Sequence, residues 1–492
     1  MPYSIHDLQS TIVALSTPPG VGALGVIRLS GLDAIRIVDD VFVGADLAKA
    51  ATHTLHYGNI RDEDGKLLDE VVVGLFKVPK SYTMEDVVEV SCHGSSYIIQ
   101  QLLELFIRKG ARLAQPGEFT MRAFLNGRMD LSQAEAVADL IAATSEAGHT
   151  LALRQMRGGV SDQIKKLRQE LIDFASLIEL ELDFSEEDVE FADRTKLKDL
   201  VEKIRRLIHE LMESFRLGNA IKRGVSTVLA GRPNAGKSTL LNALLREERA
   251  IVSDIPGTTR DTIEEVLNIK GIEFRLIDTA GIREAQDQIE SVGVEKTLEK
   301  VAQSAILLYI FDVIQTQPEE VRADLDKLVQ GGMKVLVVAN KMDLNPYTKW
   351  EHYSGGSFAG ARGQGSEEQL ADGSWQQGAQ SPNHPITQSN FIPISAINEM
   401  NIEYLKEKLY DCVVENQLSL ESPVVTSARH YDSLRRAGES LQAVLTGLDQ
   451  GITSDFIAMD IRAALNYLGE ITGEITTEDL LGNIFGRFCI GK

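Results

Sequence analysis

Hydrophobic and polar positions change their spacing several times along the chain. The first part has short apolar runs separated by turn residues, and these runs predict strands at residues 11–16, 22–30, 71–76 and 86–91. Apolar positions with helical spacing follow from Ser95 to Lys109. This combination of strands and a helix predicts a small α/β domain over residues 1–122.

From Asp130 onward the spacing is that of long helices. Residues 132–135 are Ser-Gln-Ala-Glu, which matches a capping box and predicts that a helix begins there. Apolar residues from Leu197 to Phe215 recur every three or four positions, and this predicts an amphipathic packing helix. Helical spacing returns late in the chain, at residues 426–449 and 454–468.

These changes predict about three domains, which suits a length of 492 residues. We expect an N-terminal α/β domain (1–122), a discontinuous helical domain (123–219 and 416–492) and an α/β domain inserted between its two parts (220–415). Within the inserted domain, residues 344–390 are rich in Gly, Ser and Gln and lack apolar periodicity. A loop of this length is uncommon in a compact domain, so we interpret it as a tolerated, flexible insertion.

Composition narrows the class of protein. A hydrophobic content of 43% is enough for ordinary soluble cores. The sequence shows no run of 18 or more apolar residues and no signal peptide, so we expect neither membrane insertion nor export. Three widely spaced cysteines favour a reducing, cytoplasmic compartment and argue against structural zinc. The net charge of −22 disfavours a broad contact with nucleic acid. An acidic run at residues 186–193 is either a metal site or, more simply, a solvated turn.

The strongest chemical signal is at residues 231–238, Gly-Arg-Pro-Asn-Ala-Gly-Lys-Ser. This sequence matches the phosphate-binding loop G-x-x-x-x-G-K-[ST], and it lies between a predicted strand (225–230) and a predicted helix (239–245). The glycines let backbone N–H groups face the phosphates, and the helix N-terminus adds positive potential. Lys237 can then reach the terminal phosphates, and Ser238 can bind magnesium.

Four more signals follow in the order of a Ras-like GTP-binding domain: a pair of switch threonines, an Asp-Thr-Ala-Gly strand end, Asn-Lys-Met-Asp and Ser-Ala. The Asn-Lys-Met-Asp motif selects the base, because the Asp343 carboxylate accepts hydrogen bonds that guanine donates and adenine does not. We therefore expect GTP to be bound by Asn234, Ala235, Gly236, Lys237, Ser238, Thr239, Ser253, Asp254, Ile255, Pro256, Gly257, Thr258, Thr259, Asp278, Thr279, Ala280, Gly281, Asn340, Lys341, Asp343, Ser395 and Ala396.

The residue that would position the attacking water is not the usual one. Ras-like proteins have a glutamine after the Asp-Thr-Ala-Gly sequence, whereas this chain has Ile282. Glu284, Asp287 and Glu290 are the nearby candidates. Spacing does not choose among them, and solvated switch carboxylates are the simpler alternative.

Three further features have both a structural and a functional interpretation. Arg28 and Glu89 are charged residues inside predicted strands, so they either pair with each other or bind a ligand. Cys92 and His93 form a possible dyad, although a structural role is commoner. The apolar end of the chain, residues 488–492, predicts docking of the tail, and Cys489 is either a small buried hydrophobe or a chemically active thiol.

The motifs as a set resemble those of the MnmE (TrmE) family of tRNA-modification GTPases, along essentially the whole chain. Besides the GTP-binding signals, the matching segments are Thr-Pro-Pro-Gly at 17–20, Ser-Tyr-Thr-Met-Glu-Asp at 81–86, Gln-Pro-Gly-Glu-Phe-Thr at 115–120, Arg-Ala-Phe-Leu-Asn-Gly at 122–127, Asp-Leu-Ser-Gln-Ala-Glu at 130–135 and the terminal Phe-Cys-Ile-Gly-Lys. Met84 departs from the family's usual glycine, Arg128 stands where lysine is also common, and the 344–390 insertion is long for the family.

The resemblance implies a one-carbon tetrahydrofolate (5-formyl or methylene) in the N-terminal domain, bound by Arg28, Glu89, Arg128 and Lys492. It suggests an arginine for the acidic end of the folate and a carboxylate for its pterin. It further implies a homodimer that forms a heterotetramer with MnmG, a partner using FAD and NADH. Together they would modify certain tRNAs with an aminomethyl or carboxymethylaminomethyl group at carbon-5 of the wobble uridine.

For GTP hydrolysis, the resemblance implies a potassium ion and a magnesium ion. Potassium would be bound by Asn234, Ser253, Ile255 and Thr258, and magnesium by Ser238 and Thr259. Glu290 matches the family's water-orienting glutamate, Cys489 is the second expected catalytic residue, and two GTP domains would meet across the dimer. The alternatives are a ribosome-assembly GTPase, which would need a second GTP domain or a basic RNA-binding module, and a non-catalytic folate-sensing switch.

Overall fold

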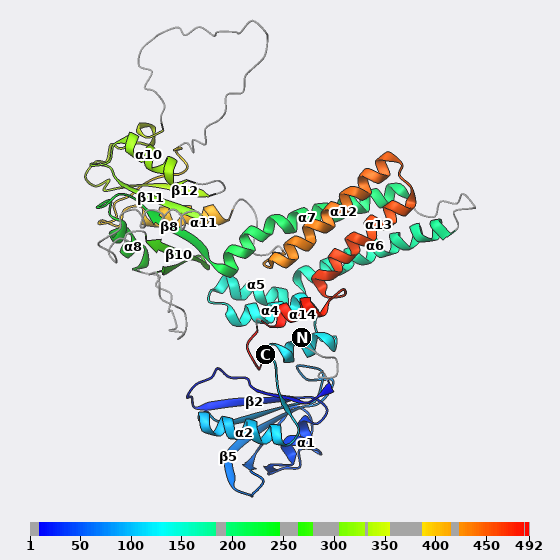
Figure 1. The fold of residues 1–492 in the computed structure, drawn as a ribbon. Coiled ribbons are helices and arrows are strands. Elements are labelled where there is room, and N and C mark those ends of the chain that lie inside the picture. Colours follow the sequence, from blue (N-terminus) through cyan, green and yellow to red (C-terminus); the bar gives the residue numbers. More distant parts are fainter. Residues whose placement is uncertain are drawn as a thin grey trace, which may run out of the picture. The chain divides into compact units, whose positions relative to one another are not determined.

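The computed structural model describes residues 9–183, 193–246, 264–278, 305–329, 333–354, 386–414, 423–486 and 488–491. They form two compact units. The first unit comprises residues 1–143, 150–213 and 427–492, and the second comprises residues 144–149 and 214–426. Figure 1 shows the elements along the chain.

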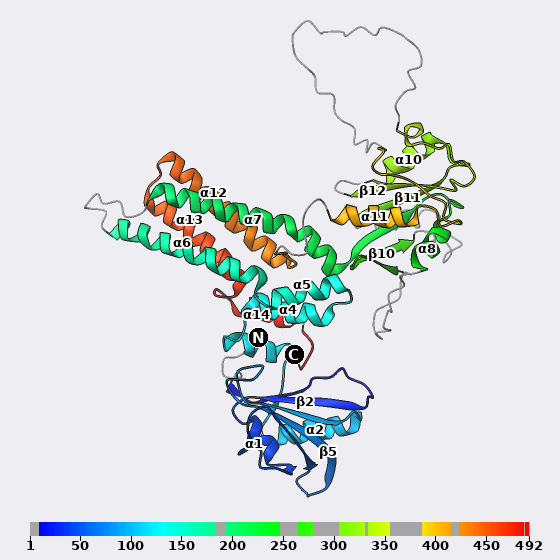
Figure 2. The same ribbon diagram turned by 180° about the vertical axis from the view of Figure 1, so that it is seen from behind.

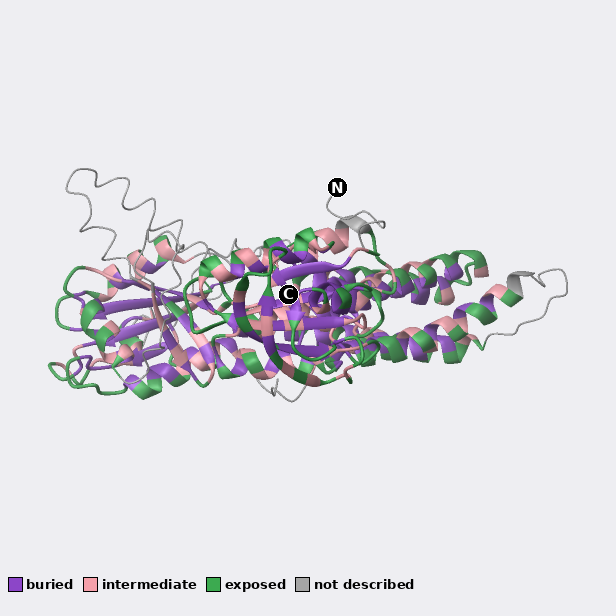
Figure 3. Cartoon of the chain, turned by 90° about the horizontal axis from the view of Figure 1, so that it is seen from below, coloured by how far each residue is buried: buried purple, intermediate pink, exposed green. Residues whose placement is uncertain are grey.

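The second unit is an α/β domain. Its six-stranded sheet has the order β13-β12-β11-β8-β10-β9, and all neighbouring strands are parallel except β9 and β10. The strands are β8 (Val225–Ala230), β9 (Glu264–Ile269), β10 (Ile272–Asp278), β11 (Ile306–Asp312), β12 (Lys334–Asn340) and β13 (Phe391–Pro393), and the helices are α8 (Lys237–Leu245), α10 (Pro318–Leu328) and α11 (Ile402–Val413). Strand β11 is buried along its whole length, and Figure 3 shows buried residues concentrated in the strands.

Both ends of the expected flexible insertion belong to the core of this domain. Tyr353, next to a short 3-10 helix (Trp350–His352), is 4% exposed, and its ring lies 4.8 Å from that of Phe311 and 5.8 Å from that of Phe391. Ile386 is equally buried in the same cluster. The interpretation of residues 344–390 as a flexible insertion is therefore wrong for these two ends. Residues 355–385 lie outside the described part of the chain.

The first unit begins with a seven-stranded sheet of order β3-β4-β5-β6-β2-β1-β7. The strands are β1 (Ile12–Leu15), β2 (Leu24–Ser30), β3 (Phe42–Val43), β4 (Thr54–Arg61), β5 (Leu67–Phe76), β6 (Val87–His93) and β7 (Arg112–Leu113). All pairs are antiparallel except β1 with β7. Helices α1 (Ala34–Asp39) and α2 (Ser96–Arg108) bury apolar residues against the sheet core. The four predicted strands and the predicted helix are confirmed, whereas β3, β4, β7 and α1 were not predicted.

The remaining helices are α3 (Glu118–Leu125), α4 (Leu131–Ala142), α5 (Glu146–Met156), α6 (Gly159–Asp183), α7 (Arg194–Arg223), α12 (Ala428–Gln450), α13 (Ser454–Thr472) and α14 (Glu478–Phe485). Helix α13 packs against α6, α12 and α4, and Figures 1 and 2 show α6, α12 and α13 side by side from both directions. Two expected domain boundaries fall inside helices, because α3 continues through residues 122–123 and α7 through residues 219–220.

The expected capping box at residues 132–135 is displaced by two residues. Helix α4 is capped by Asp130, whose carboxylate accepts a hydrogen bond from the Gln133 N–H, while the Gln133 side chain accepts one from the Asp130 N–H. Glu135 instead pairs with Arg429 and with the buried His430 of α12. Burial alone would raise the pKa of Glu135, but its contacts with His430 and Arg429 outweigh burial and lower the pKa to about 2. A capping box is therefore present, as predicted, but Glu135 is not part of it because its side chain pairs with residues of α12.

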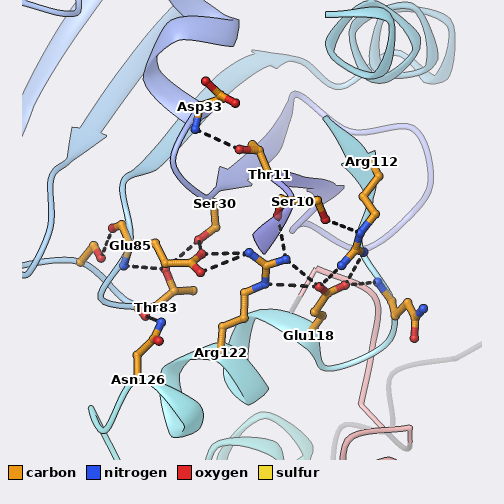
Figure 4. Close-up of polar contacts among 12 residues, drawn as sticks. Ser10, Thr11, Ser30, Asp33, Thr83, Glu85, Arg112, Glu118, Arg122 and Asn126 are labelled. Carbon is orange, nitrogen blue, oxygen red and sulfur yellow. Dashed lines mark hydrogen bonds and ion pairs between the residues drawn. The ribbon is translucent and has the colours of Figure 1, made fainter. Parts of the chain in front are cut away.

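A buried ion-pair network holds α3 to the sheet domain (Figure 4). The Arg122 guanidinium is 2% exposed and lies 2.9 Å from a carboxylate oxygen of the fully buried Glu118 and 3.2 Å from Glu85. It also donates to the Ser10 carbonyl at 2.8 Å. Arg112 forms a second, bidentate pair with Glu118. Burial tends to raise the pKa of Glu118, but the hydrogen bonds and charges around it outweigh that effect and lower it.

The same helix holds the loop 81–86 at successive positions. Arg122 contacts Glu85, the Asn126 amide donates to the Thr83 carbonyl at 2.7 Å, and the Thr120 hydroxyl lies 2.9 Å from that of Tyr82. Within this loop Met84 has a φ of 59°, in the left-handed region that favours glycine. Met84 therefore has a backbone conformation that favours the glycine usual at this position in the family.

We predict that Arg122→Met destabilises the first unit by about 3–5 kcal/mol, because it leaves the buried Glu118 and the half-buried Glu85 without their shared cation. Calorimetric unfolding of the full chain measures the loss, and GTP affinity reports on the second unit in the same samples. Arg36→Met is the matched control, since Arg36 pairs with Asp33 and Asp40 at the surface. Equal losses in the two variants would contradict a special role for the buried pair.

Candidate functional site

The phosphate-binding loop joins β8 to α8, and two of its glycines are required by close contacts. A Cβ atom on Gly231 would lie 2.1 Å from the Ile310 carbonyl oxygen, and one on Gly236 would lie 2.2 Å from the Asn340 amide nitrogen. Both glycines also have positive φ angles, 156° and 96°. The loop can therefore approach its neighbours, and a ligand, only with glycine at these positions.

The environment of this loop suits a nucleotide's phosphates. Helix α8 begins directly after Gly236, so its first N–H groups and its positive dipole end point to the loop. The Lys237 ammonium donates to the carbonyls of Gly231 (2.8 Å) and Arg232 (3.0 Å), across the loop. Ser238 and Asn234 are exposed there, and Asn234 has a φ of 63°.

Arg232, although part of the loop, is used elsewhere. Its guanidinium pairs with Glu320 and, at 2.8 Å, with Asp324, both on α10. The Tyr309 hydroxyl donates to the same Asp324 at 2.7 Å. These contacts fasten the loop to α10, so we assign Arg232 no part in binding phosphate.

The base-recognition residues surround one buried amide. Asn340 is 2% exposed; its side chain donates to the Ala235 carbonyl at 2.8 Å and accepts from the Ala396 N–H at 3.0 Å. It thereby joins the phosphate-binding loop to the Ser-Ala segment. The buried Ser395 hydroxyl donates to the exposed Asp343 carboxylate at 2.6 Å, which orients the carboxylate expected to bind guanine.

The Asn-Lys-Met-Asp motif at residues 340–343 has a partner that the sequence did not predict. The Lys341 ammonium lies 2.7 Å from the Asp312 carboxylate at the end of β11, and the Asp312 side chain is 5% exposed. Burial would raise the pKa of Asp312, but the bonds from Lys341 and the Ile314 N–H outweigh it and lower the pKa. The sequence did contain one indication: Asp312 is the last residue of an otherwise apolar strand, β11. The neighbouring strand, β12, leads into the Asn-Lys-Met-Asp motif.

Several expected site residues lie outside the described residues, so the structure does not place them. They are Ser253, Asp254, Ile255, Pro256, Gly257, Thr258, Thr259, Thr279, Ala280, Gly281, Glu290 and Lys492, together with the alternative water-binding candidates Glu284 and Asp287, residue Ile282 and most of the acidic run at 186–193. Asp278 ends β10, beside the strand that leads into the phosphate-binding loop.

The first unit contains a second polar site, on the sheet of the N-terminal domain. Arg28 on β2 and Glu89 on β6 are register partners, and their side chains pair at 2.8 Å. The Arg28 guanidinium carbon also lies 5.7 Å from the ring centroids of both Tyr82 and Phe119. The two expected ligand residues are thus brought together, and they pair with each other.

Arg128 lies at the same site. It donates to the Ser81 carbonyl, and its guanidinium carbon lies 5.6 Å from the Tyr82 ring centroid. A pocket of about 480 Å³ adjoins these groups, a volume suited to a small organic ligand. It is lined by His53, Phe76, Lys80, Ser81, Tyr82, Val87, Glu89 and Arg128.

The end of the chain docks onto this site, as its apolar composition predicted. The Gly491 carbonyl accepts hydrogen bonds from Arg28 and from the Ser16 hydroxyl, both at 3.4 Å. Gly491 has a φ of 93°, and a Cβ there would lie 2.3 Å from the Leu15 carbonyl oxygen. Cys489 is exposed, so its interpretation as a buried hydrophobe is wrong.

Cys92 and His93 do not form a reactive dyad. The Cys92 thiol is buried and donates to the Gly25 carbonyl, and burial, helped by the charge of Asp69, raises its pKa to about 11. The His93 ring pairs at 2.7 Å with Asp69 instead.

Among the residues that the structure describes, no group of three or more His, Cys, Asp or Glu side chains could hold a metal ion.

A phosphate-binding loop after a central parallel strand, with Asn-Lys-x-Asp and Ser-Ala segments joined to it through Asn340, defines a P-loop GTPase. A family model described as the MnmE helical domain matches residues 131–489, and one described as the GTP-binding protein TrmE N-terminus matches residues 11–128. The chain belongs to the MnmE family of tRNA modification GTPases.

Three relatives show how closely the chain follows this family, and each is a "tRNA modification GTPase MnmE". The protein of Cytophaga hutchinsonii is 54% identical over 489 residues, covering 99% of both chains. That of Christiangramia forsetii is 49% identical, covering 99% of this chain and all of its own. That of Bacteroides thetaiotaomicron is 45% identical, covering 98% of this chain and all of its own.

In the described part of the chain, no helix is both long and apolar enough to span a membrane.

We predict that Asp343→Asn lowers GTP affinity about ten- to hundredfold and favours xanthosine triphosphate, because the amide reverses one donor and acceptor pair with the base. Titration with both nucleotides measures the change. Asp326→Asn, an exposed change on α10 of the same unit, serves as the control. Unchanged GTP affinity in Asp343→Asn would show that another group selects the base.

Proposed function

We propose that this protein is a potassium-activated GTPase that modifies tRNA together with an FAD-containing MnmG partner. It adds an aminomethyl or carboxymethylaminomethyl group to carbon-5 of the wobble uridine of certain tRNAs, with a one-carbon tetrahydrofolate as donor. The observation that carries the proposal is the docking of Gly491 on Arg28, since Arg28 pairs with Glu89, which lines the pocket together with Arg128.

The N-terminal pocket supports the folate part of the proposal. Its lining combines aromatic and apolar side chains with a carboxylate and two cationic residues, Lys80 and Arg128. Folates have an aromatic pterin with hydrogen-bonding edges and a carboxylate tail, so this combination fits them. We assign folate binding to Arg28, Glu89, Arg128 and Lys492, and we keep Cys489, exposed two residues from the docked Gly491, as a catalytic candidate.

The GTP site supports the hydrolytic part. Ser238 and Thr259 would bind magnesium, and Asn234, Ser253, Ile255 and Thr258 would bind potassium, which when bound offsets charge that develops on the phosphates. Asn234 is exposed in the phosphate-binding loop, where its side-chain oxygen can act as a ligand. Glu290 would orient the attacking water.

The partners follow from charge and from the family. With a net charge of −22, this chain is a poor binder of tRNA phosphates on its own. We therefore assign most of the tRNA contact to MnmG, in a heterotetramer built on a homodimer of this chain in the cytoplasm. The family match over both the N-terminal and helical segments disfavours a ribosome-assembly GTPase, and no structural observation favours one.

We predict that a strain lacking this protein loses carbon-5-modified wobble uridines, and that a Cys489→Ser copy fails to restore them. The same variant should hydrolyse GTP at a nearly normal rate, because Cys489 lies in the first unit and the nucleotide site lies in the second. Mass spectrometry of tRNA nucleosides and a GTPase assay measure the two outcomes.

The matched control is Cys412→Ser, on α11 of the second unit. It should restore the modified nucleosides. An unchanged nucleoside profile in the deletion strain would refute the proposed function. Loss of GTP hydrolysis in Cys489→Ser would instead indicate a structural role for this cysteine.

We predict that GTP hydrolysis is much faster in potassium than in sodium. Potassium is large enough to contact several oxygens at once, and an arginine finger in the equivalent role contributes roughly three to five orders of magnitude in rate. Asn234→Ala should remove the difference between the two salts, and Glu290→Ala should slow turnover without weakening GTP binding. Equal wild-type rates in matched potassium and sodium buffers would rule out this mechanism.

A further inference from the structure

The geometry of the N-terminal pocket restricts how a folate can lie in it. Arg28 and Glu89 are in direct contact at 2.8 Å. The pterin and the glutamate of a folate are separated by the whole aminobenzoyl group, so one extended molecule cannot place its two ends on this pair. Arg28 therefore cannot be the arginine that binds the acidic end of a folate whose pterin is bound by Glu89.

The chemistry of the pair matches the pterin. The pterin's edge presents an N–H and an amino group, which a carboxylate accepts, next to a carbonyl oxygen, which a guanidinium donates to. Adjacent Glu89 and Arg28 supply this combination, and their side chains are only 30% and 20% exposed. The phenol ring of Tyr82 and the phenyl ring of Phe119, both beside Arg28, add aromatic surface.

The pocket is also lined by two exposed cationic residues, in contrast to the partly buried Arg28–Glu89 pair. Lys80 and Arg128 are both exposed, and among the described residues neither forms an ion pair with a carboxylate. Arg128 donates to the carbonyl of Ser81, the residue next to Lys80, so the two cations adjoin the same short stretch of backbone.

Lys80 is also held in place by its turn. The Lys80 N–H donates to the Lys77 carbonyl at 3.0 Å, and the Ser81 hydroxyl donates to the Glu85 carbonyl at 2.5 Å. Asp86 accepts from the Val78 N–H at 3.0 Å. A turn fixed by these three hydrogen bonds holds the Lys80 backbone beside the pocket that Lys80 lines.

We propose that Lys80, with Arg128, forms a carboxylate-binding subsite for the glutamate tail of the folate, and that it selects folates with several glutamates. This inference rests on the proposed folate site and deepens it. Each added glutamate brings a further negative charge, and two cations that have no carboxylate partner among the described residues attract it more strongly at low ionic strength.

The test is the affinity of the full-length protein for three ligands: 5-formyltetrahydrofolate with one glutamate, the same compound with three, and 5-formyltetrahydropteroate, which has none. Lys80→Met should weaken binding of the triglutamate about three- to tenfold, of the monoglutamate less, and of the pteroate least, since the pteroate keeps only its benzoate carboxylate. The triglutamate effect should shrink as salt is added, and Lys80→Arg should retain wild-type affinity.

Lys77→Met is the matched control. Lys77 lies three residues earlier, does not line the pocket, and donates to the Ala48 carbonyl at 3.0 Å. It should leave all three affinities unchanged.

Two results would overturn the inference in distinguishable ways. If the wild type binds none of the three ligands, the proposed folate site fails and the subsite fails with it. If the wild type binds them, but Lys80→Met weakens all three equally or none, the folate site stands and the assignment of Lys80 is wrong.

Discussion

The N-terminal site depends on a buried ion pair that never touches the pocket. Arg122 and Glu118 lie on one face of α3, and both are almost completely inaccessible to solvent. Removing either partner would leave a charge in a medium that solvates it poorly, so the pair holds α3 at one position relative to loop 81–86. That loop carries Tyr82, whose ring contacts both Arg28 and Arg128. The position of the exposed pocket residues thus follows from charges buried beneath them.

The nucleotide site is also held together by one buried side chain, but here the group is the neutral amide of Asn340. Asn340 uses its amide nitrogen for the phosphate-binding loop and its oxygen for the Ser-Ala segment. One planar side chain therefore fixes the distance between the part that would bind phosphates and the part that would bind the base. Gly236 makes this possible, since any side chain there would occupy the place of the Asn340 amide. A buried amide with both ends satisfied is a rigid spacer at little energetic cost.

The sequence was informative where a function depends on residues close together in the chain. The strand, loop and helix around Lys237 were predicted from one continuous segment. The strands that carry Arg28 and Glu89 were likewise each predicted from a short local run of apolar residues. Asp312 was missed because its role exists only when β11 lies beside β12. The capping box was displaced because two overlapping patterns compete at α4, and only the contact of Glu135 with α12 decides between them. The anchored ends of the insertion were missed because single apolar residues, such as Tyr353 and Ile386, show no periodicity.

The distribution of cations explains how an acidic chain can serve nucleic-acid chemistry. The sequence has 50 lysines and arginines against 72 acidic residues. Many of the well-placed arginines are used internally: Arg122 and Arg112 with Glu118, Arg429 with Glu135, and Arg232 with Asp324. A guanidinium that is already paired and partly buried gains little from a phosphate, because it must first lose a carboxylate. Arginines used in this way stabilise the two units and orient their sites, and they contribute little to the binding of nucleic-acid phosphates.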